Sequence, residues 1–264
     1  MATSTPIMNI MMRASEKAAR SLLRDFNEVE NLQVSRKGPG DFVSAADKRS
    51  EEIIFEELRK ARPDYSFLME ESGAVKGKDS DYRWIIDPLD GTTNFLHGIP
   101  HWAISIGLEY KGEVVAGLIH DPVKDDLFHA EKGKGAFSKR RRLRVSNRNT
   151  SEASLITTGA PRRAADKREK FISEYHAMQE AGFSLRRFGA AALDLAYVAA
   201  GKCDGFWERD LSPWDVAAGV ILVKESGGFI SDIDDIRHNP VNTGNILATN
   251  EQLSNDIARI LKKA

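Results

Sequence analysis

The sequence predicts a layered α/β fold, because helical and strand-like patterns are mixed in both halves of the 264-residue chain. Successive strand-like runs with short turns between them fill the middle of the chain, which indicates antiparallel hairpins. Apolar residues make up 41% of the composition, enough for a substantial core. No run approaches the roughly 20 consecutive apolar residues of a membrane helix, so we expect a globular protein without a membrane segment.

The individual elements follow from the spacing of apolar residues and from the positions of glycine and proline. A loop at residues 37–41, with two glycines and a proline, separates the first two helices. The expected helices cover residues 7–26, 44–58, 167–181, 190–200, 213–226 and 250–262. The expected strands cover residues 66–69, 83–86, 103–110, 114–119, 127–130, 155–158, 205–208, 228–231 and 245–248.

Charge and cysteine content narrow the classes of function. The 38 Lys and Arg residues oppose 39 Asp and Glu residues, so the net charge of −1 gives no general reason to expect nucleic-acid or membrane binding. Cys203 is the single cysteine, which excludes an internal disulfide and suits a reducing compartment. The amphipathic first 20 residues lack the apolar segment and cleavage site of a signal peptide, so a cytoplasmic location is expected.

The densest chemistry lies in residues 84–95, Trp-Ile-Ile-Asp-Pro-Leu-Asp-Gly-Thr-Thr-Asn-Phe. A strand ends in Asp87, and the proline and glycine that follow turn the chain and present Asp90. Two carboxylates this close repel each other unless a cation neutralises them, and oxygen ligands without a His or Cys cluster favour magnesium. The N–H groups of Gly91 and Thr92 offer a seat for phosphate. The alternative is an ordinary turn with solvated carboxylates.

Further acidic residues occur at the ends of other predicted elements. Glu70 ends an apolar run, where α/β folds place ligands, although a solvated strand end is the alternative. Asp215 follows Ser212 and Pro213 at the third position of a helix, and Asp47 follows Ser44 in the same way. Both aspartates therefore also fit a purely structural role in capping a helix. Each site is weak alone, but the set predicts a metal centre.

These residues, in this order, resemble the double signature of the inositol monophosphatase family. The first signature matches residues 84–95, and the second matches residues 214–219 and continues to 225–228. Further matches occur at 41–47, at Glu70 and Glu71, and at 189–208, so the resemblance covers nearly the whole chain. It implies a five-layer αβαβα sandwich of the sugar-phosphatase type, usually found as a homodimer. It also implies hydrolysis of a small phosphomonoester such as inositol-1-phosphate.

The resemblance further implies two to three magnesium ions in each active site. Carried over by position, the first ion is held by Glu70, Asp87 and the main-chain oxygen of Leu89. The second is held by Asp87, Asp90 and Asp215, and a third, weaker ion lies near Glu70. Family members of this kind are also sensitive to lithium.

Catalytic and substrate-binding roles are carried over in the same way. Thr92, oriented by Asp47, would help Glu70 position and deprotonate a metal-activated water for in-line attack on phosphorus. The phosphate would contact Gly91 and Thr92, and Lys37 matches a lysine that shapes the metal-site loop. The residues expected to contact the polyol are Asp90, Gly189, Ala190, Ala191, Glu208 and Asp215.

A boundary near residues 148–151 would divide the chain into two halves that share a cleft. Residues 1–150 form an N-terminal α+β half with the metal site, and residues 151–264 form a C-terminal α/β half that completes a single catalytic unit.

Departures from the family occur at the substrate wall, where Phe188 replaces a smaller residue and Ala190 stands where bacterial relatives often have serine. Both changes should weaken hydrogen bonding to an inositol ring.

Other substrates and another class of function stay open. Fructose-1,6-bisphosphate, NADP, histidinol phosphate and a 3′-phosphonucleotide fit the same chemistry, although the short distance between Glu71 and Asp87 favours the inositol-phosphatase group. A regulatory member that binds RNA or protein is the other class, and the basic run at residues 139–144 is its local signal. The competing interpretation of that run is a solvated hairpin turn. His97, His101 and Cys203 are interpreted as structural.

Overall fold

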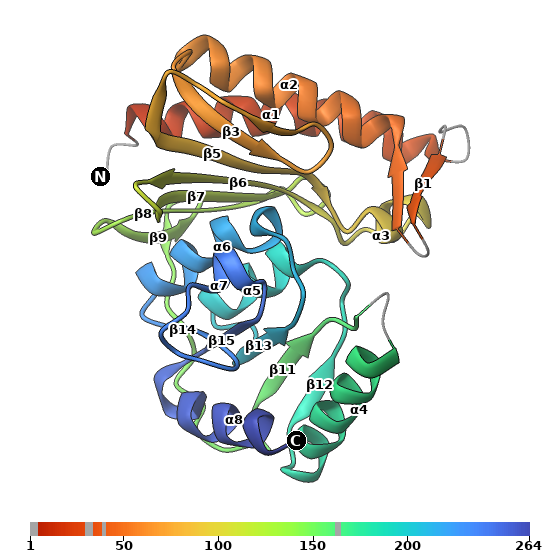
Figure 1. Cartoon of the computed structure of the whole chain (residues 1–264), viewed down its shortest axis with the longest axis vertical. Helices are drawn as coiled ribbons and strands as arrows, with labels where there is room; N and C mark the ends of the chain where they lie inside the picture. The colour runs from red at the N-terminus through yellow and green to blue at the C-terminus, as the bar shows by residue number, and fades with distance from the viewer. Residues whose placement is uncertain (1–4, 30–33, 39–40, 162–164) are drawn as a thin grey trace.

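The computed structural model describes residues 5–29, 34–38, 41–161 and 165–264; residues 34–38, 41–44, 165 and 166 are described by their backbone alone. Helices and sheets alternate in five layers (Figure 1), which confirms the predicted αβαβα sandwich. Among the described residues, no helix combines the length and apolar character needed to cross a membrane.

The first layer consists of α1 (Pro6–Asn27) and α2 (Ala45–Ala61). Helix α1 begins one residue before the predicted start, because the Thr5 hydroxyl accepts a hydrogen bond from the N–H of Met8 and Pro6 occupies the first turn. The expected loop at 37–41 is instead part of a hairpin of β1 (Val34–Gly38) and β2 (Asp41–Ser44), of which residues 39 and 40 lie outside the description. The apolar faces of both helices cover the outer face of a large sheet.

The second layer is an eight-stranded sheet in the order β10-β9-β8-β7-β6-β5-β3-β4. Strand β3 is parallel to β5, and every other neighbouring pair is antiparallel, as the hairpin pattern predicted. The strands are β3 (Tyr65–Met69), β4 (Gly73–Val75), β5 (Asp79–Asp90), β6 (Ala103–Tyr110), β7 (Glu113–Asp121), β8 (Asp126–Glu131), β9 (Gly135–Ser138) and β10 (Arg141–Arg142).

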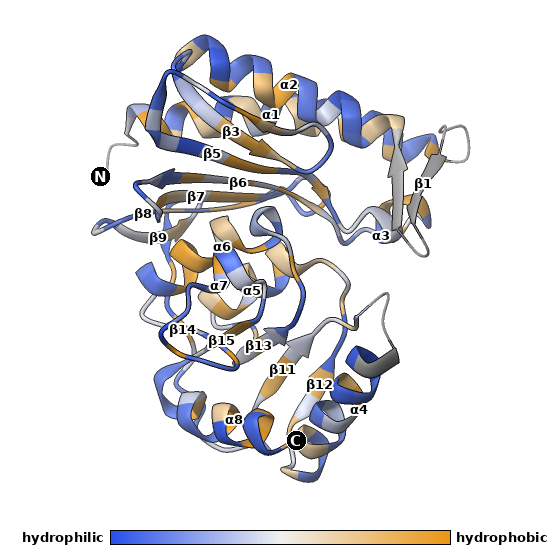
Figure 2. Cartoon of the chain, viewed as in Figure 1, coloured by the Kyte–Doolittle hydropathy of each residue, from blue (hydrophilic) through white to orange (hydrophobic). Residues whose placement is uncertain are grey.

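The middle layer contains α5 (Ala191–Ala199) and α6 (Pro213–Glu225), which pack between the two sheets. Residues 216–223 of α6 are all buried, as expected of a helix that is apolar on every side. Figure 2 shows the hydrophobic residues concentrated on these helices and on the strands beside them, whereas the outward side of α2 is largely hydrophilic. Two short helices, α3 (Thr92–Leu96) and α7 (Pro240–Thr243), lie in the connections.

The last two layers are a five-stranded sheet and the pair α4 (Ala165–Glu180) and α8 (Glu251–Lys263). The strand order is β12-β11-β13-β15-β14, with β11 parallel to both neighbours and the other pairs antiparallel. The strands are β11 (Leu155–Thr158), β12 (Ser184–Arg186), β13 (Gly205–Glu208), β14 (Phe229–Asp232) and β15 (Ile246–Thr249). The described strands of the large sheet all precede residue 150 and those of the small sheet all follow it, while the division of the chain into two halves stays a prediction.

Candidate active site

A cleft of about 490 Å³ opens where the end of β5 meets the N-terminal ends of α5 and α6. Every residue predicted to bind metal or substrate lines it, whereas Asp47 lies behind Thr92. The predicted residues on its walls are Glu70, Asp87, Leu89, Asp90, Gly91, Thr92, Gly189, Ala190, Ala191, Glu208 and Asp215.

Three carboxylates converge on the floor of the cleft. Asp87, Asp90 and Asp215 each offer an oxygen, and these oxygens all lie within 4.8 Å of one another. Burial raises the pKa of Asp87 well above its usual range, and the other acidic residues of the cleft, Glu70 first, raise it further. A set of oxygen ligands whose negative charges oppose one another fits a hard divalent cation.

The turn after β5 is held by hydrogen bonds within residues 87–92. The N–H of Leu89 donates to Asp87 Oδ1 at 2.9 Å. Thr92 Oγ1 lies 3.1 Å from the main-chain oxygen of Leu89 and 3.2 Å from Asp47 Oδ1, so its hydroxyl can donate to either. Gly91 has a φ of 90°, which favours glycine, and an added Cβ would lie 3.0 Å from the oxygen of His101.

Asp215 fits both interpretations that the sequence left open. Its Oδ2 accepts a hydrogen bond from the N–H of Ser212 at 2.6 Å, which forms the predicted capping box of α6. The same carboxylate belongs to the group of three on the cleft floor. Asp47 differs, because its carboxylate accepts from Thr92, while the side chains of Ser44 and Lys37 lie outside the described atoms.

The wall expected to contact the polyol begins at Gly189. The Asn94 side chain donates to the main-chain oxygens of His101 at 2.8 Å and of Phe188 at 2.9 Å, which ties this wall to the first signature. Ala190 lines the cleft as expected, but Phe188 is not among the described lining residues. The expectation for Phe188 was wrong, because its ring packs against His101 and Tyr197 instead.

Glu208 also lines the cleft, and its carboxyl group lies close to Gly159. A Cβ at position 159 would lie 1.9–2.1 Å from the carboxyl atoms of Glu208, so a larger residue there would displace this carboxylate from its present position. Asp194, which sequence reasoning did not single out, lines the cleft nearby and is 1% exposed. Burial, and then the charges of Glu208 and Asp90, raise the pKa of Asp194 well above its usual range.

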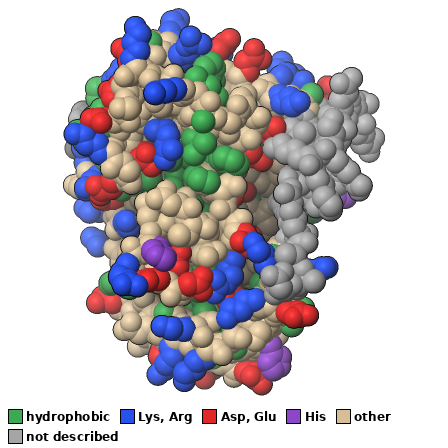
Figure 3. Space-filling model, viewed as in Figure 1, with side chains coloured by type: hydrophobic (Ala, Val, Ile, Leu, Met, Phe, Trp, Pro, Cys, Tyr) green, Lys and Arg blue, Asp and Glu red, His purple; other side chains and the backbone are tan. Residues whose placement is uncertain are grey.

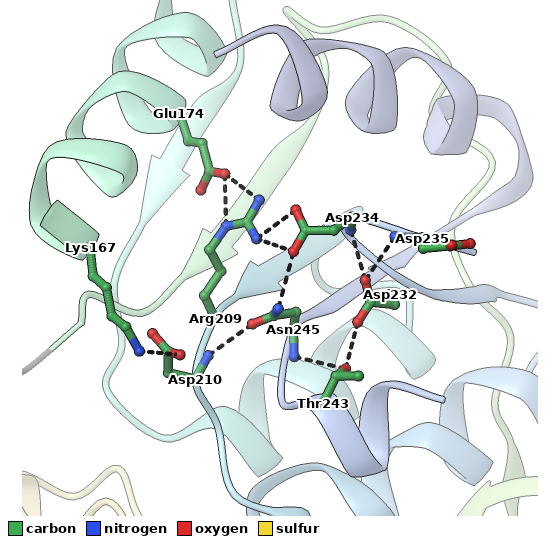
Figure 4. A network of polar contacts seen from close by, with 9 residues as sticks. All are labelled: Lys167, Glu174, Arg209, Asp210, Asp232, Asp234, Asp235, Thr243 and Asn245. Carbon is green, nitrogen blue, oxygen red and sulfur yellow. Dashed lines mark hydrogen bonds and ion pairs between the residues drawn. The ribbon is translucent and has the colours of Figure 1, made fainter. Parts of the chain in front are cut away.

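Basic side chains also line the cleft, and sequence reasoning missed them because they lie far apart in the chain. Arg187, Lys167 and Arg209 belong to this group. Arg209 Nε donates to Glu174 Oε1 at 2.9 Å, and Arg209 Nη1 donates to Asp234 Oδ2 at 2.8 Å. Figure 4 shows these two carboxylates on different sides of the guanidinium group. Lys167 pairs with Asp210 at 2.6 Å. Arg209 is therefore held in place by carboxylates on two sides.

The surroundings of His101 and Cys203 fit the structural role expected of them. His101 is largely buried, which lowers its pKa to about 4, and its main-chain oxygen accepts from Asn94. Burial raises the pKa of the Cys203 thiol to about 12, so it is not a reactive thiolate. Within the basic run at 139–144, residues 139 and 140 form the turn between β9 and β10, and residues 141 and 142 are β10 itself; Lys139 is paired with Asp125 at 2.8 Å.

Known proteins match this chain in both sequence and structure. The model of the inositol monophosphatase family matches residues 4–264. An inositol-1-monophosphatase of Mesorhizobium japonicum is 52% identical over 97% of this chain and 96% of its own length. The Nus factor SuhB of Escherichia coli is 41% identical over 94% of this chain and 92% of its own.

Solved structures give the same result. The extragenic suppressor protein suhB of Bartonella henselae has a TM-score of 0.94 and 52% identity, covering 98% of this chain and 100% of its own. The inositol monophosphatase of Anabaena has a TM-score of 0.85 and 39% identity, covering 98% and 96%. Fold, cleft and sequence agree, and the chain belongs to the inositol monophosphatase family of phosphoric monoester hydrolases.

Proposed function

We propose that this phosphatase hydrolyses inositol-1-phosphate, or a similar small polyol phosphate, with magnesium as its cofactor. The observation that carries the proposal is the group of Asp87, Asp90 and Asp215, whose oxygens lie within 4.8 Å of one another. The name of the Mesorhizobium relative, at 52% identity, supports the same substrate.

Two to three magnesium ions would share the cleft. Glu70, Asp87 and the main-chain oxygen of Leu89 would hold the first, and Asp87 would bridge to a second ion held by Asp90 and Asp215. Glu70 fits this set, since it lines the cleft and its charge raises the pKa of Asp87, although it is not one of the three clustered carboxylates. Bound magnesium lowers the pKa of water and stabilises negative charge on the phosphoryl group.

The protein's own groups would orient the reactants. Glu70 would accept the proton of the attacking water, and the Thr92 hydroxyl, which lies 3.2 Å from Asp47, would fix that water in line with the phosphorus. The phosphate would rest on the N–H groups of Gly91 and Thr92. Asp90, Asp215 and Glu208 would accept hydrogen bonds from polyol hydroxyls, beside the wall of Gly189, Ala190 and Ala191.

A substrate panel tests this function. We expect phosphate release from inositol-1-phosphate that requires magnesium and stops when the metal is chelated. Fructose-1,6-bisphosphate, NADP and a 3′-phosphonucleotide serve as competing substrates. A higher kcat/KM for one of these would replace the substrate assignment, and the absence of release from all of them would overturn the function.

A regulatory role in RNA or protein binding is the second candidate, favoured by the relatives named Nus factor SuhB at 39–42% identity. Arg140, in the β9–β10 turn, and Arg141 and Arg142, which form β10, are all exposed. On the face drawn in Figure 3, however, Lys and Arg are interspersed with Asp and Glu. That face therefore offers no uniformly basic surface that would bind the phosphate backbone of RNA. Filter binding of RNA to the wild type and to a variant with these three arginines changed to alanine distinguishes the two roles.

We further propose a homodimer in the cytoplasm. The family resemblance supports the dimer, and the single buried Cys203 suits a reducing compartment. Sedimentation equilibrium at micromolar concentration tests the oligomeric state.

A further inference from the structure

One face of α2 carries three buried polar side chains beside the metal cleft. Asp47, Ser50 and Glu51 are 0%, 0% and 3% exposed. Residues three and four positions apart lie on the same side of a helix, so the three point in one direction. Burying polar groups is unfavourable unless they form hydrogen bonds, and apolar residues would fill this space at lower cost.

Each of these side chains contacts a different segment of the active site. Asp47 lies 3.2 Å from the Thr92 hydroxyl at the start of α3. Ser50 donates to the main-chain oxygen of Pro88 at 2.8 Å, between the ligands on β5. Glu51 accepts from the N–H of Glu71 at 2.8 Å, in the turn that follows Glu70. Helix α2 thus connects three segments that meet only in the folded cleft.

The contact of Glu51 carries the inference, because it holds the short turn of residues 70–72. Met69 pairs with Gly73 in the β3–β4 hairpin, which leaves only residues 70–72 to form the loop. Both oxygens of Glu51 are used there: Oε2 accepts from the Glu71 N–H, and Oε1 accepts from the Ser72 hydroxyl. Such bonds to a charged acceptor are roughly twice as strong as neutral ones.

The loop is also fixed on its other side. The N–H of Glu70 donates to the oxygen of Ile86, one residue before Asp87, at 3.2 Å. Glu70 is therefore placed between an anchor on β5 and an anchor on α2. A change at Glu51 would release the second anchor, and the direction of the Glu70 side chain would no longer be set by the turn.

We propose that Glu51 is a positioning residue for magnesium: by binding the Glu71 N–H and the Ser72 hydroxyl, it fixes the turn that aims Glu70 into the metal cleft. The inference rests on the proposed function, since it assumes that Glu70 is a ligand. Glu51 itself does not line the cleft among the described residues. Residues that hold metal ligands in place typically change metal affinity by roughly 10- to 100-fold when they are replaced.

Two substitutions grade the effect. Glu51→Leu keeps a helix-forming side chain of similar reach but removes both acceptors, whereas Glu51→Gln keeps one acceptor oxygen. The matched control is Glu52→Gln, which changes an exposed carboxylate on the neighbouring position of α2. Glu52→Gln changes the net charge by the same amount as Glu51→Gln. A general electrostatic effect on magnesium binding would therefore appear equally in both variants.

The measurement is magnesium binding by isothermal titration calorimetry, with substrate absent, and the magnesium concentration for half-maximal activity as a second readout. We expect the magnesium Kd to increase at least tenfold in Glu51→Leu, by an intermediate factor in Glu51→Gln, and less than twofold in Glu52→Gln. At saturating magnesium, Glu51→Gln should recover most of kcat, which a general loss of structure would not allow.

Three results would contradict the proposed positioning role of Glu51. A Kd within twofold of wild type in Glu51→Leu would overturn the role, and so would equal losses in Glu51→Gln and Glu52→Gln. If Glu51→Leu does not fold, a Glu51→Gln protein with wild-type Kd would be sufficient to reject it. Failure of the proposed function is distinguishable, because the wild-type protein itself would then bind no magnesium.

Discussion

Asp90 Oδ2 accepts a hydrogen bond from the main-chain N–H of Ala192 at 2.7 Å. A carboxylate at the end of β5 therefore caps the first turn of α5, which carries the wall of the cleft. The same side chain belongs to the group of three carboxylates with Asp87 and Asp215. Asp90 thus couples the position of α5 to that of the other two carboxylates of the cleft.

Asp90→Asn and Asp215→Asn should each remove most turnover and leave the fold intact. An amide oxygen can still accept from Ala192 or Ser212, but the charge that would bind the second metal ion is lost. Steady-state kinetics at saturating magnesium, with circular dichroism as the control for folding, measure the effect. Turnover within about threefold of wild type, a barrier change below about 1 kcal/mol, would show that the altered residue is not a ligand.

Magnesium should stabilise the folded protein. Binding to the native state alone adds about 2.7 kcal/mol at a hundredfold excess over the Kd, so Tm should rise with magnesium at neutral pH. The increase should shrink near pH 5, where protons compete for the same oxygens. Asp87→Asn should nearly abolish it, whereas Asp256→Asn, an exposed carboxylate on α8, should not. A small rise that is equal in both variants would indicate only a general salt effect.

Asp194 should make the metal-free protein less stable as pH increases. Its pKa in the folded state is raised above 3.8, so the native state keeps a proton that the unfolded chain has released. The free energy of unfolding therefore decreases as pH rises from about 4 through the folded-state pKa. Asparagine resembles the protonated form, so in EDTA we expect Asp194→Asn to melt above wild type at pH 8 and to lose this advantage at pH 5. The reverse order would mean that the charged form is stabilised.

Ala190→Ser should favour inositol-1-phosphate over glycerol-2-phosphate. One neutral hydrogen bond contributes about 0.5–1.5 kcal/mol, or roughly two- to tenfold in kcat/KM. Because Ala190 is the N-cap of α5, serine should also raise Tm, by a stabilisation of about 1 kcal/mol. Glycerol-2-phosphate has fewer hydroxyls to reach the wall and serves as the control. A higher Tm with an unchanged ratio of the two substrates would mean that the hydroxyl only caps the helix.

Lithium should inhibit at millimolar concentration when magnesium is saturating. A small monovalent ion in the second site would retain product phosphate without supplying the full charge of magnesium. Phosphate release is measured against lithium chloride, with sodium chloride at equal ionic strength for comparison. Equal inhibition by both salts would contradict the expectation and point to a lithium-resistant relative.

Elements with strong local patterns were predictable from the sequence. Strands 103–110 and 155–158 are observed with the predicted bounds, because each is a short apolar run between turn signals. The three-residue strands β4 and β12 were missed: β12 pairs with β11, which is distant in the sequence, and the three residues of β4 are too few to show an alternating pattern. The hairpin of β1 and β2 was missed because the glycines and the proline at residues 38–40 indicated a loop.

The site was predictable where a motif carried it, and not where side-chain direction decided it. Residues 87–92 and Asp215 were identified from the double signature, and the cleft brings them together. Phe188 was assigned to the wall because of its place before Gly189, but the backbone directs its ring toward His101. Glu51 was not predicted to support the site, because a glutamate in a charged helix is most often exposed to solvent.

The position of α6 between the two sheets affects the stage of synthesis at which the cleft can be completed. Its buried residues 216–223 pack against strands of both sheets, and it brings Asp215 to a cleft whose other two carboxylates belong to β5. A nascent chain can complete the large sheet while α6 is still inside the ribosome. That intermediate would expose the apolar inner face of the sheet and hold two carboxylates without the third. With Asp215 as a proposed metal ligand, catalytic competence would be one of the last properties that a growing chain acquires, and premature release would favour aggregation over partial activity.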